Sequence, residues 1–369
     1  MRPTLFRRPV GLTIALSLAA GGALLLSGAL GAVDLAANIA RLIRQLGSDD
    51  FDEREAASKA LDKIGKAALP ALRKARHDDD AEVRRRVEDL IESIPARLRD
   101  EALSELKRAG AILDLRSDEP GTTISCVRLA GIKDAGPLLG HVASLPELLS
   151  LDLHDARLTD NDLEQIADLT ELRILNLHGT GIGDAGLAHL ARLKRLTYLD
   201  LGRTRVKGDG LKHLRGFDAL EWLDLSGTPL DDAGLARLPP LPTLRNLWLA
   251  ETKVTDKGMA RLDDLPKLCR LGLSATAVGN AGLKRVAGLT DLQQLQLDGT
   301  RVTDDGLKHL VSLKRLGELE LSQTRITDAG LPHLCGLKKL WLLGLLEAPV
   351  TDRGIAELRK ALPNVALLR

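Results

Sequence analysis

The sequence predicts an α/β solenoid, in which a curved parallel sheet lines the concave face and helices cover the convex face. A small α-helical domain is expected before the repeats. Three observations lead to this fold class. Leucines recur every 24 residues over two thirds of the chain, single residues alternate with leucines after each of them, and aromatic residues make up only 2% of the 369 residues, so the core must be aliphatic.

Charge and cysteine content exclude several classes of protein. The chain has 52 Lys and Arg against 51 Asp and Glu, so a strongly basic nucleic-acid binder is excluded and we expect no nucleic-acid partner. Three cysteines in 369 residues exclude a scaffold held together by disulfides.

The first segment, residues 1–33, is predicted to be a signal peptide or an N-terminal membrane anchor. Arg2, Arg7 and Arg8 precede an uncharged apolar run over residues 10–33. A cleaved signal peptide has this pattern, and an uncleaved run of this length is also long enough to span a bilayer. Both alternatives place the rest of the chain outside the cytoplasm, as a secreted protein, a periplasmic protein or one anchored at the outer face of the inner membrane.

Residues 34–95 form a charged helical segment. Apolar residues recur there at spacings of three and four, which predicts about four short helices packed as two hairpins. The stretches 52–65 and 80–90 resemble HEAT-type helical repeats. The Arg84-Arg85-Arg86 run is a candidate anion site, but we interpret it as a solvated helix face that nearby aspartates balance.

Residues 96–123 are expected to provide a linker helix, over about 96–109, and an N-terminal cap. Two apolar strand patterns flank Pro120-Gly121, which predicts a β-hairpin whose second strand becomes the first strand of the repeats. At the other end, residues 364–369 are predicted to form a closing strand with no helix after it.

Ten repeats of 24 residues are predicted over residues 124–363, without insertion or deletion. Nine leucines occupy one position of the repeat: Leu148, Leu172, Leu196, Leu220, Leu244, Leu268, Leu292, Leu316 and Leu340. The alternating leucines of each unit predict a short strand, and the later leucines, three residues apart, predict one or two helical turns. A unit this short must stack on its neighbours to bury its apolar face.

The pattern L-x-x-L-x-L-x-x-T-x-hydrophobic-T-D-x-G-L resembles the leucine-rich repeat family, in the short form found in bacteria. Many members carry asparagine at the position where this chain has threonine, from Thr180 to Thr324 in steps of 24. We expect these threonines to bond neighbouring turns as the asparagines do. The resemblance implies a curved scaffold that most often binds proteins, and it implies no catalytic activity.

Other repeated polar residues are interpreted as parts of the scaffold. One position is filled by aspartates, with Asn280 once, and these side chains are predicted to cap the helices: Asp160, Asp184, Asp232, Asp256, Asp304, Asp328 and Asp352. Glycines two residues later, from Gly186 to Gly354, are expected to allow close packing between coils. Five histidines that share one position are placed on the convex helices.

Nothing in the sequence points to an enzyme. It has no G-x-S-x-G, H-E-x-x-H, Walker or C-x-x-C motif. Cys126, Cys269 and Cys335 fall at three different repeat positions and lack metal-ligand spacing. We therefore expect no catalytic residues, no cofactor and no metal site.

The candidate binding residues lie between the strand leucines, where the alternation makes them face the concave side. They are Tyr198, Trp222, Trp248, Asp152, Asn176, Asp200, Asp224, Asn246, His154 and His178. The aromatics lie on three consecutive strands, and large aromatics on an exposed sheet are candidate hot spots.

The hypothesis from this pattern is that the aromatic and acidic side chains bind a basic segment of a partner protein. A glycan is an alternative ligand, because sugar rings stack on tryptophan and tyrosine while aspartate and asparagine bond hydroxyls. A third alternative is a rigid spacer of the cell envelope whose concave residues bind nothing. His154 and His178 are neighbours, so a metal site there is a further, weaker alternative.

Overall fold

The computed structural model describes residues 34–116 and 123–369, in two compact units with the boundary between Asp100 and Glu101. The predicted signal peptide or anchor and the Pro120-Gly121 turn lie outside these residues. Within the described ranges, no helix is both long and apolar enough to cross a membrane.

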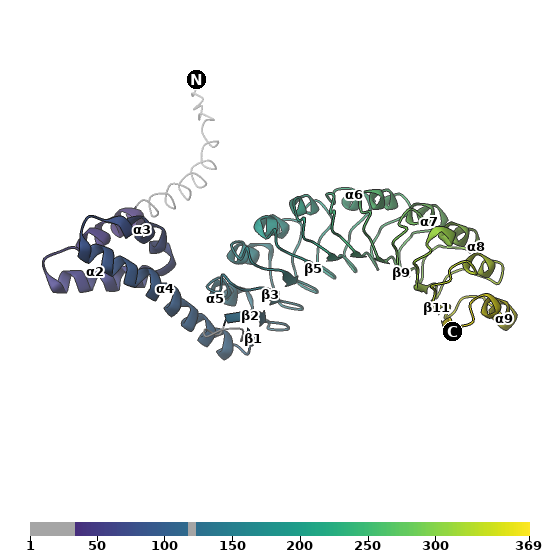
Figure 1. Ribbon diagram of the computed structural model, residues 1–369, viewed down its shortest axis with the longest axis horizontal. Coiled ribbons are helices and arrows are strands. Elements are labelled where there is room, and N and C mark those ends of the chain that lie inside the picture. The colour runs from purple at the N-terminus through teal and green to yellow at the C-terminus, as the bar shows by residue number, and fades with distance from the viewer. Residues whose placement is uncertain (1–33, 117–122) are drawn as a thin grey trace, which may run out of the picture. The chain divides into compact units, whose positions relative to one another are not determined.

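The first unit is helical, which confirms the predicted N-terminal helical segment (Figure 1). Helical residues 34–45 are followed by longer elements and short 3-10 turns. Their bounds are α2 (Phe51–Ile64), η1 (Gly65–Ala68), α3 (Leu69–Lys74), η2 (Ala75–His77) and α4 (Ala81–Arg108). Asp50 caps α2, since its carboxylate accepts a hydrogen bond from the amide of Asp52 at 2.8 Å. Buried aliphatic residues of the helical residues 34–45 and of α2, η1, α3 and α4 form a core of their own.

Helix α4 is longer than predicted. The separate linker helix expected over 96–109 is the C-terminal part of α4, which continues through Pro95. The reason is visible in the apolar pattern, because Ile94, Leu98, Ala102 and Leu106 follow one another at intervals of four and form one stripe along one helix.

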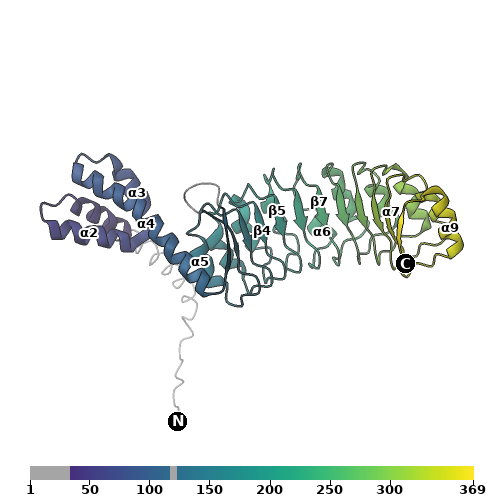
Figure 2. The same cartoon turned by 60° about the horizontal axis from the view of Figure 1, so that its bottom comes forward.

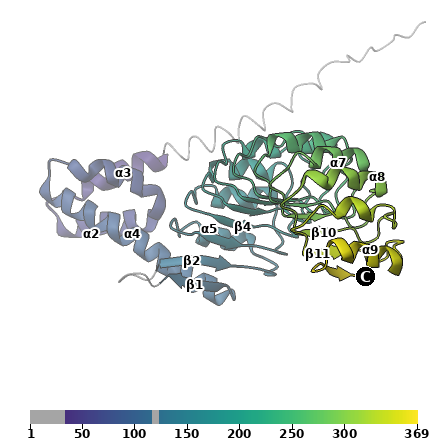
Figure 3. The ribbon, with the colours of Figure 1, turned by 45° about the vertical axis from the view of Figure 1, so that its right-hand side comes forward.

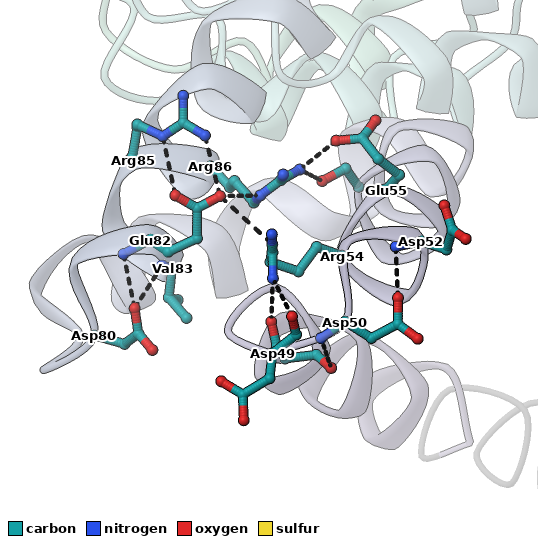
Figure 4. Close-up of polar contacts among 12 residues, drawn as sticks. Asp49, Asp50, Asp52, Arg54, Glu55, Asp80, Glu82, Val83, Arg85 and Arg86 are labelled. Carbon is teal, nitrogen blue, oxygen red and sulfur yellow. Dashed lines mark hydrogen bonds and ion pairs between the residues drawn. The ribbon is translucent and has the colours of Figure 1, made fainter.

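In the arginine run at the start of α4, Arg84 and Arg85 are exposed as predicted, whereas Arg86 is buried, contrary to the prediction (Figure 4). Arg86 is only 8% exposed. Its guanidinium donates to Glu55 of α2 at 2.7 Å and to Glu82 of its own helix at 2.6 Å. Arg84 instead donates to the carbonyls of Asp78 and Asp79, at 2.6 and 2.9 Å. These arginines hold the helical unit together, which leaves no cluster of free cations for an anion.

The same network predicts acid sensitivity of the helical unit. Hydrogen bonds from Arg85 and Arg86 lower the pKa of Glu82 from 4.5 to about 2. The folded-state pKa is depressed, so the stability that Glu82 contributes is complete above pH 4.5 and is lost as the pH falls through about 2. Hydrogen exchange of the α2 and α4 amides should therefore accelerate over this window. In Glu82→Gln this part of the acid dependence should disappear, and an unchanged profile would contradict the assignment.

The second unit contains one sheet of 12 strands in sequential order (Figure 2). Strands β1 (Ile112–Arg116) and β2 (Thr123–Arg128) are antiparallel, and every later pair from β2 onward is parallel. The nine repeat strands have three residues each: β3 (Ser150–Asp152), β4 (Ile174–Asn176), β5 (Tyr198–Asp200), β6 (Trp222–Asp224), β7 (Asn246–Trp248), β8 (Arg270–Gly272), β9 (Gln294–Gln296), β10 (Glu318–Glu320) and β11 (Leu342–Gly344).

Helices cover the opposite side of this sheet, so that the strands line the inside of the arc and the helices its outside (Figure 1). Their bounds are η3 (Gly136–Leu138), α5 (Leu139–Val142), η4 (Asp160–Ile166), η5 (Gly186–Arg192), η6 (Leu211–Leu214), α6 (Asp232–Leu235), η7 (Gly258–Asp264), α7 (Asn280–Val286), α8 (Asp304–Leu307), η8 (Lys308–Ser312), η9 (Leu331–Leu334) and α9 (Asp352–Ala361). Many are 3-10 helices, because leucines three residues apart match a helix of three residues per turn. The predicted fold class is confirmed.

The two ends of the sheet differ (Figure 3). At the front, β2 joins the antiparallel partner β1 to the parallel strands. At the back, β12 (Ala366–Leu368) pairs with β11 in parallel. Between them one continuous aliphatic cluster runs from Leu106 to Val365, with Phe217 as its aromatic member.

The threonine column works differently from the prediction. Each buried threonine hydroxyl donates to the leucine carbonyl three residues earlier in its own repeat, as Thr204 does to Leu201 at 2.6 Å. The threonines therefore close the turn after their own strand and do not bond neighbouring coils, because the short side chain reaches only its local carbonyl.

The aspartate column supplies the missing bonds between coils, and its prediction as a set of helix caps is wrong. Asp232 is typical, since its carboxylate accepts from the Thr255 amide at 2.8 Å, the Thr255 hydroxyl at 2.7 Å and the Gly258 amide at 3.0 Å. All of these donors belong to the next repeat. The cap position is the preceding residue, such as Asp231 or Thr351.

The glycine column exists because of this arrangement, as predicted from close packing. A Cβ atom on Gly186 would lie 2.6 Å from a carboxylate oxygen of Asp160, and one on Gly282 would lie 2.7 Å from that of Asp256. The aspartates and glycines thus form one device that joins each coil to the next.

Candidate functional site

The exact register of the sheet brings the predicted aromatic residues together. Tyr198 pairs with Trp222, and Trp248 lies on the next strand, one position further along. The rings of Tyr198 and Trp222 are stacked with centroids 5.5 Å apart, and those of Trp222 and Trp248 are tilted with centroids 5.6 Å apart. Three rings therefore form one continuous row across β5, β6 and β7.

The row stands on the sheet, with Trp222 between the other two rings. The two faces of the Trp222 ring are thus turned toward Tyr198 and Trp248. At the end of the row, Gly272 makes room for Trp248, because a Cβ atom there would collide with the indole ring. A partner would meet ring edges along the row and an open ring face only at its ends.

Two polar groups in this row of rings are buried without a hydrogen-bond partner. Among the described residues, the indole N–H groups of Trp222 and Trp248 are buried and have no hydrogen-bond acceptor. A buried donor without an acceptor costs about 1–3 kcal/mol. Phenylalanine would fill much of the same space without this cost, so stability alone does not explain two tryptophans at these positions.

The four side chains beside the row, Asp152, Asn176, Asp200 and Asp224, have a structural role as well. One oxygen of each accepts a hydrogen bond from the backbone amide two residues later, which ends the strand in an Asx turn. Asp200 accepts from Gly202 at 2.8 Å, Asp224 from Ser226 at 2.7 Å and Asn176 from His178 at 3.0 Å. Asp152 does the same with His154 at 3.2 Å. These bonds explain why aspartates sit side by side despite their like charges.

Burial changes the ionisation of this surface. Asp200 is only 8% exposed. Burial raises the pKa of Asp224, the hydrogen bonds from Ser226 oppose this rise, and the charge of Asp200 adds to it. Burial, followed by the charges of Asp200, Asp224 and Asp152, raises the pKa of Tyr198 to about 12. The site therefore holds concentrated negative charge that a cation would relieve.

The remaining predicted residues lie around this centre. Nδ1 of His154 is 2.9 Å from Asp152, and Nδ1 of His178 is 3.5 Å from Asp200. Asn246 is only 9% exposed, and its amide donates to the carbonyl of Glu221 at 3.2 Å, so it supports the strands more than it presents itself to a partner.

No metal centre is found in the part of the chain that the structure describes, where no group of three or more His, Cys, Asp or Glu residues is placed to hold an ion. The three cysteines are free and half-buried.

Trp341 is a concave-side residue that the sequence reasoning missed. It directly precedes β11, and the alternation of the strand says nothing about a residue outside it. With Trp222 and Trp248, it lines a hollow of about 280 Å³ that also contains Arg270 and Glu318. The signal available in the sequence was that the chain has only three tryptophans, and all three lie on this surface.

Comparison with known proteins identifies the same repeat unit. Residues 169–191 match the family model described as leucine-rich repeat, and this segment spans one of the units that repeat in register from β3 to β11. The match covers one unit of the repeat, and the second unit has the fold of a leucine-rich-repeat solenoid.

Two solved structures with leucine-rich repeats are similar to it. An internalin from Listeria monocytogenes is 17% identical, with a TM-score of 0.41, and the match covers 74% of this chain and 94% of that one. A leucine-rich-repeat protein of Leptospira interrogans is 18% identical, with a TM-score of 0.34, and the match covers 62% and 74%. A search of curated protein sequences finds no match.

Proposed function

We propose that this leucine-rich-repeat protein is a non-enzymatic scaffold that binds a basic, extended segment of a partner protein on its concave sheet. The proposed surface is the aromatic–acidic patch, defined as Tyr198, Trp222, Trp248, Asp152, Asp200 and Asp224. One observation carries the proposal, namely that a row of three aromatic rings runs beside desolvated carboxylates. Leucine-rich-repeat folds commonly serve as protein-binding scaffolds, and this supports a protein ligand.

The chemistry of the patch suits lysine and arginine. Their aliphatic stems pack on apolar surface while their charged ends reach polar groups. Along the row the stems would lie on the ring edges, and the charged ends would reach Asp200 and Asp224. Each of these carboxylates accepts the backbone amide of its Asx turn, and the side chains of Tyr198 and Ser226 also bond Asp200 and Asp224, so a cationic end would share these carboxylates with the two hydroxyls.

The charge distribution of the sheet supports the same conclusion. The positions of strands β3 to β7 that face the concave side include the carboxylates of Asp152, Asp200 and Asp224 and contain no lysine or arginine; Arg173 and Arg245 lie just before their strands. An acidic strand surface of this kind accelerates the association of a basic segment and discriminates against acidic ones.

The proposed location is outside the cytoplasm. This part of the proposal rests on the charged and apolar pattern of residues 1–33. A rigid spacer of the cell envelope would have the same location, but it would not need the aromatic–acidic patch.

A peptide selection tests the proposed function. A display library of random linear peptides would be selected on the full chain and on the double variant Asp200→Asn, Asp224→Asn. Asparagine keeps the Asx-turn acceptors and removes only the charge. The parent should enrich peptides with lysine or arginine, and the double variant should not.

The control variant, Asp209→Asn with Asp305→Asn, has the same change in net charge at exposed positions of the convex side. It should enrich the same lysine- and arginine-containing peptides as the parent. No enrichment by the parent, or equal enrichment by the double variant, would contradict the proposal and favour the spacer.

A further inference from the structure

The hollow beside the aromatic–acidic patch continues into a second one. The first hollow, of about 280 Å³, contains all three tryptophans. The second, of about 410 Å³, shares Gln293 and Trp341 with it and adds Arg315 and Lys339. Together they fall within the roughly 300–1,000 Å³ of ligand-binding pockets. We call the two hollows the tryptophan groove.

Trp341 separates the two hollows and lines both. Trp341 is 57% exposed, whereas Trp222 and Trp248 are half-buried. Gly317 on the neighbouring coil makes room for it, because a Cβ atom there would lie 2.8 Å from the indole nitrogen. A large, exposed ring held between two hollows is a surface on which a flat apolar face can stack.

The groove has no aliphatic lining. Apart from tryptophan and glycine, its lining residues are charged or carry amides. The amides of Gln293 and Gln294 each combine a donor and an acceptor. Gln294 donates to Glu318 at 2.7 Å, which holds both side chains in place. A peptide side chain of the leucine or valine kind would find no apolar pocket here, whereas a sugar offers ring faces for the indoles and hydroxyls for the amides and carboxylate.

The charge of the groove is opposite to that of the patch. Arg270, Arg315 and Lys339 line it against the single carboxylate of Glu318. Arg315 pairs with Asp291 at 2.7 Å. Among the described residues, Arg270 and Lys339 have no ion-pair partner, and Arg270 makes only a long hydrogen bond of 3.4 Å to Asn246. One such cation in each hollow suits a ligand with more than one negative group.

We propose that the tryptophan groove binds an acidic oligosaccharide of a few sugar units. Sugar rings stack on Trp341 and Trp248, hydroxyls bond Gln293, Gln294 and Glu318, and sugar carboxylates pair with Arg270 and Lys339. This site goes beyond the proposed binding of a basic segment, because its charge is opposite to that of the patch, although Trp222 and Trp248 line both.

Isothermal titration calorimetry on the full chain tests the proposal. The probes are trisaccharides of galacturonate, glucuronate and mannuronate, with maltotriose as the neutral control and a linear peptide rich in aspartate and glutamate as the protein control. At least one acidic trisaccharide should bind about tenfold more tightly than maltotriose and the acidic peptide. It should also shift the tryptophan emission, because every tryptophan of the chain lines the groove. Binding of no acidic trisaccharide, or binding of the acidic peptide as tightly, would overturn the proposal.

Two variants separate this site from the patch. Trp341→Ala with Lys339→Ala should weaken the trisaccharide about tenfold or more and leave the basic peptides unaffected. The double variant Asp200→Asn, Asp224→Asn should weaken binding of the basic peptides and leave binding of the trisaccharide unaffected. Arg173→Ala, an exposed residue at the position of Trp341 in an earlier repeat, is the control and should change neither. Saccharide binding that survives the groove variant would overturn the assignment of the site, whatever the peptides do.

Discussion

Asp232→Ala is expected to lower the free energy of unfolding by about 2–4 kcal/mol, as measured by urea denaturation of the full chain. The carboxylate holds three donors of the following repeat, namely the amide and hydroxyl of Thr255 and the amide of Gly258. Alanine leaves these donors without an acceptor at a half-buried junction between coils. Because each coil contacts mainly its neighbours, breaking a central junction weakens the whole solenoid.

The matched control is Asp352→Ala, at the same position of the last repeat. Its carboxylate is 96% exposed and, among the described residues, pairs with the Arg369 side chain instead of holding backbone amides of another coil. Its loss should change stability by less than about 0.5 kcal/mol. Equal effects of the two variants would show that the aspartates act locally and not as junctions between coils.

Trp222→Ala is expected to weaken binding of the selected basic peptides by about 100-fold, as measured by calorimetry. Trp222 lies between Tyr198 and Trp248, so its loss removes the central ring and the contacts that hold the other two in place. Circular dichroism of the variant should match that of the parent, because the strand leucines beneath the row are unchanged.

Trp222→Phe sharpens this test. Phenylalanine keeps a ring in the row and removes a buried indole N–H that has no acceptor among the described residues. We expect stability equal to or above that of the parent, with a much smaller loss of peptide affinity than in the alanine variant. A tryptophan that serves only to cover the sheet would instead give equal peptide affinity in all three proteins.

Much of the second unit could be predicted from the sequence because its period is uniform. Leucines that alternate in each unit predict strands, and an unbroken 24-residue period predicts strands in register. For this reason the sequence alone places Tyr198 and Trp222 side by side, as the register of β5 and β6 has them. The three-residue spacing of later leucines likewise indicated short helices.

Features that depend on neighbouring coils or distant helices could not be predicted this way. Whether Asp232 bonds its own helix or the next repeat depends on the distance between coils, which a pattern within one repeat does not contain. Arg86 is buried because Glu55, on another helix, lies opposite it. The concave position of Trp341 could not be predicted because this residue lies outside the strand, where the alternation of side chains does not apply.

The aspartates of the patch show how one residue type can serve fold and binding together. Asp200 and Asp224 end their strands through one oxygen, and this local role accounts for their recurrence. Asn176 has the same role without the charge. The difference between these positions is therefore one of charge alone, and it offers a test in which the fold is held constant.

That test is the affinity of the selected basic peptide for Asn176→Asp, measured by calorimetry at low and high salt. The new carboxylate keeps the acceptor for the His178 amide and adds a charge between Asp152 and Asp200. If the concave patch binds a basic segment, the variant should bind the peptide several-fold more tightly at low salt, and the gain should shrink at high salt. An unchanged or weaker affinity would contradict binding of the segment at this patch.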